Sequence, residues 1–268
     1  MPTTLTTSSW LFPPRTREVQ LDEKWSFVFK KQKNCDPLDP ADDHRGDWWD
    51  HVAYDPEHRL VLAVVPGARV TENAVEVVQQ VADRTATTPE LFTCDAYPVY
   101  EAAIAEVYGT LCVPARDGGP GRPAAPVLEV PSEVTYATVH KERARGRVVA
   151  IVTAVVLGTS LAVAGALERS AVSGTINTSL VERQHATDRG RNARKARRTY
   201  KFSKDWRVHE AMTYFTLYSY NFCWAVRTLR ERREDDRWQQ RTPAMAAGLA
   251  DHVWSLKEWL TFPVVQRI

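Results

Sequence analysis

Three acidic residues have positions that suit metal-dependent chemistry. Asp22 lies inside a segment with apolar residues at alternate positions, where aspartate is disfavoured. Asp95 follows the short apolar run 91–94, and ligands of α/β sheets gather at the carboxyl ends of strands. Glu182 opens a segment rich in arginine. Carboxylates from separate elements can bind Mg²⁺, and two such ions can promote an in-line displacement at a phosphodiester.

Each of these acids also has a purely structural interpretation. Asp22 could face solvent on an edge strand, and its neighbour Glu23 must point to the opposite face. Asp95 could accept hydrogen bonds from free N–H groups where a helix begins. Ser179 and Glu182 have the spacing of a capping box, in which Glu182 turns back to the Ser179 backbone. The residues alone leave both interpretations open.

The segment after Glu182 is strongly basic, which favours a site beside a polyphosphate strand. We expect a helix from Ser179 to about Arg198, and Asp188 is the only acid between 183 and 204, too few for pairing along the helix. Arg189 follows Glu182 by seven residues and shares its helix face. The alternative is a solvated surface. The nine basic residues are Arg183, Arg189, Arg191, Arg194, Lys195, Arg197, Arg198, Lys201 and Lys204.

Apolar periodicity predicts the elements that must position these residues. Strands are expected at 19–31, 47–54, 59–65, 91–94, 134–141 and 148–157. Helices are expected at 71–85, 98–108 and 179–198, and along two apolar stripes, 212–229 and 245–260. Five prolines and three glycines between 114 and 131 predict a loop or an inserted segment. The order of strands and helices is typical of an α/β fold.

Composition limits the class of protein. The chain has 268 residues, of which 44% are hydrophobic and 25% charged, and this excludes a disordered, collagenous or disulfide-scaffold class. Residues 1–100 hold 10 basic against 16 acidic residues, a net of −6, and residues 101–268 hold 25 against 17, a net of +8. Such asymmetry suits cations at one place and a polyanion at another, or two solvated surfaces. The four scattered cysteines favour the cytoplasm.

The segment 148–167 carries no charge over 20 residues and is long enough for a membrane span. Its first half is rich in valine, and Gly158 interrupts it, so we favour a buried strand followed by a turn and expect no membrane association. The N-terminal residues show no pattern of a secretory signal.

The other chemical candidates are weaker. The seven histidines show no metal-ligand spacing, and His185, although near Glu182, is interpreted as a plain surface histidine. The aromatic residues between Trp206 and Leu229 could stack on bases, but their spacing favours core packing. The chain has no nucleophile elbow and no dinucleotide-binding fingerprint.

Several segments in order resemble the DDE transposases of bacterial insertion sequences, in particular the group related to insertion sequence one. The resemblance covers roughly residues 17–260. It is carried by LDEKWSFVFKK, GDWWDHVAYDPEHRLVLAVVPGARVTENA, LFTCDAYPVYEAAI, NTSLVERQHATDRGRNARKARRTYKFSKDW, YNFCWAVRTLR and RTPAMAAGLADHVWSL.

The resemblance implies a ribonuclease-H-like mixed sheet flanked by helices, with an insertion before the catalytic helix and a helical C-terminal part. The implied parts are a flexible N-terminus (1–16), a catalytic domain (17–231, with the insertion at about 114–170) and a C-terminal helical extension (232–268).

The resemblance also implies a function. Asp22, Asp95 and Glu182 would bind Mg²⁺ or Mn²⁺ and catalyse hydrolysis at transposon ends and strand transfer to target DNA. The nine basic residues would contact DNA, the chain would form a dimer or a larger assembly on it, and it would associate with the nucleoid.

One departure from this family concerns the start of the chain. Relatives usually carry an N-terminal module that reads the transposon end, whereas here 21 residues without cysteine or histidine precede Asp22. We therefore expect a catalytic domain without its end-reading module, which is a truncated element, a second reading frame, or a chain that needs a DNA-binding partner or the product of an upstream frame. The alternative is a non-catalytic DNA-binding remnant of a transposase.

Overall fold

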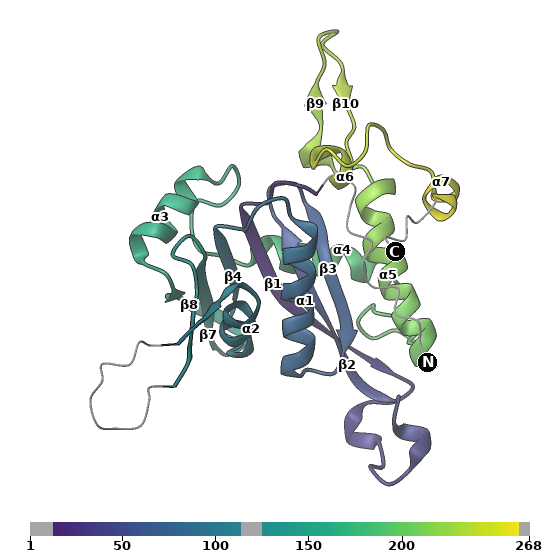
Figure 1. Ribbon diagram of the computed structural model, residues 1–268. Helices are drawn as coiled ribbons and strands as arrows, with labels where there is room; N and C mark the ends of the chain where they lie inside the picture. Colours follow the sequence, from purple (N-terminus) through teal and green to yellow (C-terminus); the bar gives the residue numbers. More distant parts are fainter. Residues whose placement is uncertain (1–12, 114–124, 263–268) are drawn as a thin grey trace, which may run out of the picture.

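The computed structural model describes residues 13–113 and 125–262, and its centre is a six-stranded mixed sheet (Figure 1). The strand order is β3-β2-β1-β4-β7-β8. Neighbours β1, β4 and β7 run parallel, and the other pairs are antiparallel. The strands are β1 (Glu18–Val28), β2 (Gly46–Asp55), β3 (Leu60–Gly67), β4 (Leu91–Asp95), β7 (Thr135–Ala144) and β8 (Arg147–Leu157).

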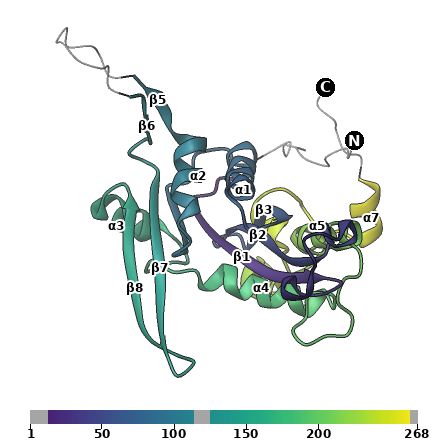
Figure 2. The same ribbon diagram turned by 90° about the horizontal axis from the view of Figure 1, so that it is seen from below.

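Helices cover both faces of this sheet (Figure 2). On one face, α1 (Thr71–Arg84) and α2 (Val99–Tyr108) bury the larger apolar core, which includes Val19 and Leu21 of β1. On the other face lie α4 (Ser179–Arg191) and α5 (Trp206–Cys223), and a smaller core joins Val52, Val181 and Leu217 there. The α/β class predicted from the sequence is confirmed.

The predicted strands and the first two helices agree with the structure, and apart from those of β8 their apolar residues pack into the two main cores, one on each face of the sheet. The order of the strands excludes one structural interpretation of Asp22. β1 lies between β2 and β4, so the interpretation of Asp22 as a residue of an edge strand is wrong.

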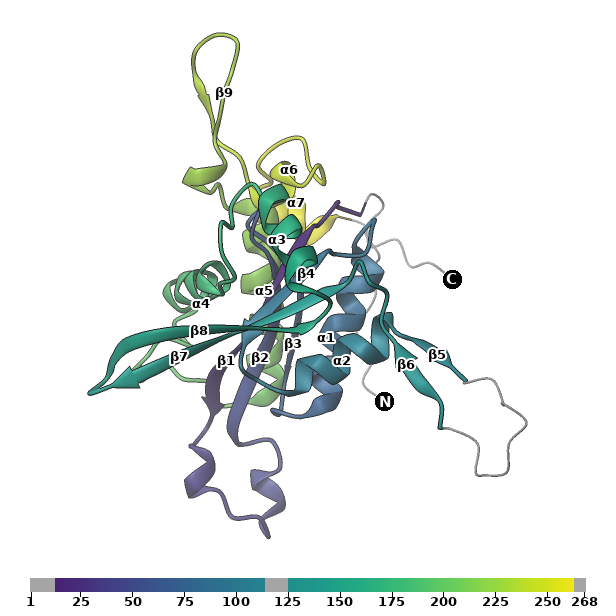
Figure 3. The ribbon, with the colours of Figure 1, turned by 90° about the vertical axis from the view of Figure 1, so that its left-hand side faces the viewer.

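The charge-free segment 148–167 forms most of β8 and of α3 (Ser160–Arg169), which are separated by a turn at Gly158. The expectation of a buried strand is wrong, because β8 is an edge strand of the sheet and Val149 and Ile151 are 61% and 62% exposed. Gly158 has a φ of +82°, a left-handed conformation that favours glycine. The hairpin β7–β8 extends beyond the other strands (Figure 3). No helix among the described residues is long and apolar enough to cross a membrane.

The rest of the predicted insertion is only partly described. Residues 114–124 lie outside the described part, and a short two-stranded sheet of β5 (Thr110–Cys112) and β6 (Val127–Glu129) flanks them. Of the predicted flexible N-terminus, residues 1–12 also lie outside it.

Two predictions of long helices are wrong. Helix α4 ends at Arg191, because the chain after it turns inward and buries Lys195. Further along, the chain passes beside the end of β1, where the Phe29 N–H donates a hydrogen bond to the Ser203 carbonyl at 2.7 Å. The basic residues from Arg194 onward therefore lie on an irregular segment, 192–205.

The C-terminal extension is also less helical than predicted. After α5 come a short 3₁₀ turn at Arg227–Leu229 and a hairpin of β9 (Glu231–Arg232) and β10 (Trp238–Gln239). Two short helices follow, α6 (Pro243–Ala246) and α7 (Leu256–Thr261). The apolar stripe 245–260 does not form one helix, because Gly248 adopts a φ of +73° and Ser255 caps a new helix.

Candidate functional site

The even-numbered residues of β1 form a polar row beneath α4 and α5. Gln20 accepts hydrogen bonds through Oε1 from the backbone N–H groups of Leu180 and Val181, at 3.1 and 3.0 Å. This side chain thereby satisfies free donors at the start of α4. Two residues further along the same face, Asp22 points towards the middle of the helix. The hydrogen bonds from α4 to Gln20 hold the start of this helix against β1, so that Glu182 of α4 lies near Asp22 of β1.

The register of the sheet brings Asp22 and Asp95 to neighbouring positions. Leu21 pairs with Cys94 in the parallel ladder of β1 and β4, and the two aspartates follow one residue later on each strand. Adjacent strands are about 4.8 Å apart. On β4, Phe92 and Cys94 face the core beneath α1 and α2, so Asp95 belongs to the opposite face, as Asp22 does.

Glu182 lies in the first turn of α4, over the same face of the sheet. Its Oε1 accepts a hydrogen bond from the Thr178 hydroxyl at 2.9 Å and contacts the ammonium of Lys141 on β7. The predicted capping box is wrong, because Thr178 is the N-cap and the Ser179 N–H donates to Asn177 Oδ1 instead. The Glu182 side chain is 45% exposed and points into the site.

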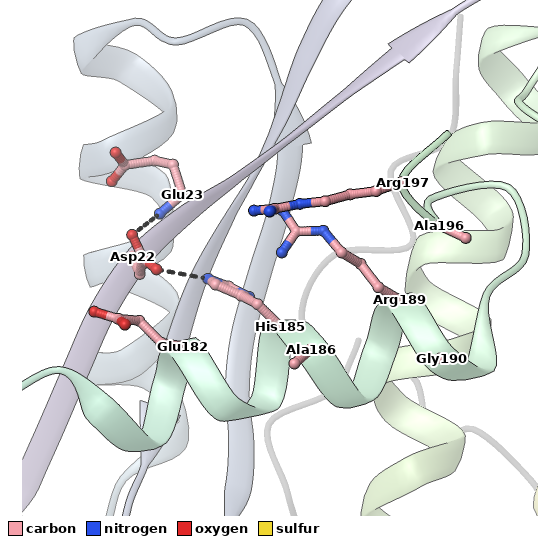
Figure 4. Close-up of a pocket in the computed structure, with 9 residues that line it drawn as sticks. All are labelled: Asp22, Glu23, Glu182, His185, Ala186, Arg189, Gly190, Ala196 and Arg197. Carbon is pink, nitrogen blue, oxygen red and sulfur yellow. Dashed lines mark hydrogen bonds and ion pairs between the residues drawn. The ribbon is translucent and has the colours of Figure 1, made fainter. Parts of the chain in front are cut away.

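Asp22 and Glu182 line an open pocket of about 700 Å³ (Figure 4). His185, Arg189 and Arg197 line it as well, and the two guanidinium groups lie side by side opposite the acids. The pocket therefore has one acidic and one basic end. The sequence argument that Arg189 shares the helix face of Glu182 is confirmed.

The three predicted acids, which we name the open acidic cluster (Asp22, Asp95 and Glu182), are linked through the pKa of Asp95. Burial raises the pKa of Asp95, and the nearby carboxylates of Asp22 and Glu182 raise it further. Lys141 and Arg69 offset part of this effect. Excess negative charge at one place favours binding of a cation.

A fourth carboxylate lies behind this cluster. The Glu23 side chain points to the opposite face of β1, where burial raises its pKa to about 7 although Arg69 donates a hydrogen bond to it. Its backbone N–H donates to Asp22 Oδ1 at 2.9 Å and helps to orient that carboxylate.

The nine basic residues do not form one surface. Arg189 and Arg197 face the pocket, and burial together with repulsion by Arg197 lowers the pKa of Arg189. Arg191 instead packs over the rings of Tyr220 and Trp224 and donates to the Thr216 carbonyl. The exposed members of the set are Arg183, Arg197, Arg198, Lys201 and Lys204, and Arg194 is half-buried.

Lys195 cannot contact DNA from its observed position, which corrects that prediction. Its ammonium is buried, lies 2.5 Å from Asp50 Oδ2 and also contacts Thr213. Lys24 of β1 lies 3.1 Å from the same Asp50 oxygen and contacts Asp188. We call these four residues the buried ion cluster (Lys24, Asp50, Asp188 and Lys195). Asp188 is therefore a partner of a buried lysine and not of the basic surface.

His185 is the site residue that the sequence interpretation missed. It is only 4% exposed, which contradicts its assignment as a surface histidine. Its Nε2 lies 3.1 Å from Asp22 Oδ2, and neither ring nitrogen has a hydrogen-bond partner in the described part of the chain. The signal available in the sequence was the spacing of Glu182 and His185, three residues apart on one helix face.

The chemistry of these donors fits a divalent metal ion. Three carboxylates offer the oxygen ligands that Mg²⁺ prefers, and imidazole adds a nitrogen ligand acceptable to Mn²⁺. The structural observation that supports this fit is the buried ring of His185, whose Nδ1 has no hydrogen-bond partner in the described residues and whose Nε2 faces the Asp22 carboxylate. Within residues 13–113 and 125–262, no three His, Cys, Asp or Glu side chains are already arranged around one point as ligands of a single ion.

Comparison with known proteins adds no assignment. A scan against models of protein families finds no match, and a search of the curated proteins finds no significant match.

Proposed function

We propose that this chain is the catalytic part of a DNA transposase that uses Mg²⁺ or Mn²⁺ to cleave and join phosphodiesters. The observation that carries the proposal is the open acidic cluster, which combines three carboxylates from β1, β4 and α4 with a pocket whose other end holds Arg189 and Arg197. Acids without enough internal cations favour a metal ion, and paired guanidinium groups favour a phosphate.

The topology supports the same proposal. Three antiparallel strands, β3-β2-β1, continue into the parallel strands β4 and β7, and the acids lie on the first and fourth strands and on a later helix. This arrangement is compatible with the ribonuclease-H-like core that the resemblance to DDE transposases implies. If the chain has this core, β8 and α3 belong to the insertion that the resemblance implies before α4.

The residues would divide the work as follows. Asp22, Asp95 and Glu182 would hold the metal ions, which when bound activate the attacking oxygen and stabilise the leaving oxygen of an in-line displacement. Arg189 and Arg197 would bind a phosphate beside the scissile bond. In hydrolysis, water attacks the phosphorus, the bond to the leaving 3′ oxygen breaks, and a 3′-hydroxyl and a 5′-phosphate result. In strand transfer, that 3′-hydroxyl attacks the phosphorus of a phosphodiester in the target DNA, a new phosphodiester bond forms, and the bond to the target's own 3′ oxygen breaks, which leaves a 3′-hydroxyl on the target.

The proposal is tested by nicking of supercoiled plasmid by the full chain with Mg²⁺ or Mn²⁺. We expect nicking by the wild type and none above background by Asp95→Asn, which keeps the side-chain size and removes the charge. Asp83→Asn is the matched control, because Asp83 is exposed on α1.

DNA binding measured in parallel separates the alternatives. If the wild type binds duplex DNA but does not nick it with either metal, the chain is a non-catalytic DNA-binding remnant. If Asp95→Asn nicks as well as the wild type, the assigned role of Asp95 is wrong.

A further inference from the structure

His185 has an environment that packing alone does not explain. Its ring is buried between α4 and β1 and points into the pocket, towards Asp22 (Figure 4). Nδ1 has no hydrogen-bond partner in the described residues, whereas Nε2 lies 3.1 Å from Asp22 Oδ2, at ion-pair distance but outside hydrogen-bond geometry. A buried polar group without a hydrogen bond costs about 1–3 kcal/mol. Such a group at the edge of an acidic pocket indicates a missing ligand.

Two other buried histidines provide a comparison. In His209, Nδ1 lies 2.8 Å from the Ser203 hydroxyl and Nε2 lies 3.1 Å from the Ser26 hydroxyl, so both nitrogens have partners. In His51, Nδ1 lies 3.1 Å from the Val65 carbonyl, and only Nε2 has no hydrogen-bond partner in the described residues. His185 has neither kind of partner and has only the nearby carboxylate oxygen of Asp22.

We infer that His185 is a nitrogen ligand of the metal ion at the open acidic cluster and that it makes this site prefer Mn²⁺ to Mg²⁺. The inference rests on the proposed function and adds a ligand to it. A Glu-x-x-His spacing on a helix places two ligands on one face, as in helical di-iron and di-manganese carboxylate sites. Glu182 and His185 have this spacing, and both line the pocket beside Asp22.

The preference follows from the chemistry of the donors. Mg²⁺ takes oxygen ligands almost exclusively and gains little from an imidazole. Mn²⁺ also takes carboxylate oxygen, but it accepts an imidazole nitrogen beside the carboxylates, as in the Glu-x-x-His sites of di-manganese proteins. His185 should therefore strengthen the binding of Mn²⁺ much more than the binding of Mg²⁺.

The test is a direct measurement of metal binding to the full chain, with no DNA present. Electron spin echo envelope modulation of bound Mn²⁺ should show coupling to a histidine nitrogen, and labelling the protein with ¹⁵N-histidine should change its frequencies. His185→Gln should abolish this coupling and weaken Mn²⁺ binding, measured by calorimetry, by at least about tenfold. Mg²⁺ binding should change by less than about threefold. The matched control is His44→Gln, because His44 is exposed and remote from the pocket.

The outcomes distinguish the two proposals. If Mn²⁺ binds, is lost in Asp95→Asn, and shows no nitrogen coupling, His185 is not a ligand while the metal site stands. If the wild type binds neither metal, both the inference and the proposed function fail. Because the spin-echo measurement uses the wild-type protein, absence of nitrogen coupling would overturn the inference even if His185→Gln does not fold.

Discussion

Two clusters of charged residues lie two residues apart on the same face of β1, and they are built on opposite principles. The buried ion cluster sets two lysines against two aspartates in the interior, and both lysines lie close to Asp50. The open acidic cluster gathers three carboxylates near Lys141 and Arg69, and two of them, Asp22 and Glu182, line an open pocket. One cluster is neutral within the protein, and the other has an excess of acid.

The pKa values follow this difference. Burial would raise the pKa of Asp50, but Lys195 and Lys24 outweigh it and hold that pKa well below its usual range. Burial and repulsion by Asp22 both raise the pKa of Asp95. On the same strand and helix, carboxylates that are paired with buried lysines stabilise the fold, whereas carboxylates without enough nearby cations can bind a ligand.

The largest expected effect is on folding stability. Asp50→Ala leaves two buried lysines without their shared partner, and breaking a buried ion pair in this way costs about 3–5 kcal/mol. Asp95→Ala should change the free energy of unfolding by less than about 1 kcal/mol, because it removes a partly exposed and repelled charge. Urea unfolding measures both values, and similar losses in the two variants would remove the distinction between the clusters.

The next effect is stabilisation by metal. If the open acidic cluster binds Mn²⁺, a concentration one hundred times the Kd should stabilise the wild type by about 2.7 kcal/mol. The double variant Asp22→Asn, Asp95→Asn should show no such gain. Thermal unfolding with and without metal measures it, with Glu101→Gln as a control on the exposed face of α2. Equal stabilisation of the double variant would place the metal elsewhere.

A smaller effect is expected at the basic end of the pocket. If Arg189 and Arg197 each meet one phosphate, their joint replacement by alanine should reduce the slope of log affinity against log salt by about 1.8. The loss should be the same on two unrelated duplexes, since backbone contacts carry no sequence information. Arg232→Ala with Arg237→Ala, on the exposed hairpin β9–β10, is the control. An unchanged slope would assign DNA binding to another surface.

The smallest effect is the pH dependence of stability, measured without metal. Because the pKa of Asp50 is lowered in the folded state, its contribution is present at neutral pH and is lost as the pH falls below the usual aspartate range near 3.8. Asp95 has a raised pKa, so its ionised form costs stability above that pKa and the cost disappears on acidification. The Asp95→Asn variant should therefore have a larger free energy of unfolding than the wild type at neutral pH, and this difference should vanish below about pH 4. A stability difference that grows as the pH falls would contradict a raised pKa for Asp95.

Local patterns predicted most of the sheet because each strand has its own apolar face. Val19 and Leu21 alternate with Gln20 and Asp22, and this period identifies β1 and separates the faces without knowledge of the fold. The order of the three acids along the chain was also accessible, as was the place of Arg189 relative to Glu182.

The partners of charged residues could not be predicted. Lys195 belongs to a basic run in the sequence, yet its partner Asp50 lies 145 residues earlier. Lys141 and Glu182, or His185 and Asp22, meet only after β7 and α4 have packed on the sheet. The prediction of one helix over the apolar stripe 245–260 was wrong for a related reason. Apolar spacing does not reveal that the helix is interrupted at Gly248 and that a new one begins after Ser255.

The most direct test of the central claim is anomalous diffraction from crystals of the full chain soaked in Mn²⁺. We expect a strong peak bounded by the carboxylates of Asp22 and Asp95, within ligand distance of Glu182 or His185, and loss of that peak in Asp95→Asn. A peak only at other carboxylates, or no peak in crystals whose pocket is open to solvent, would contradict it.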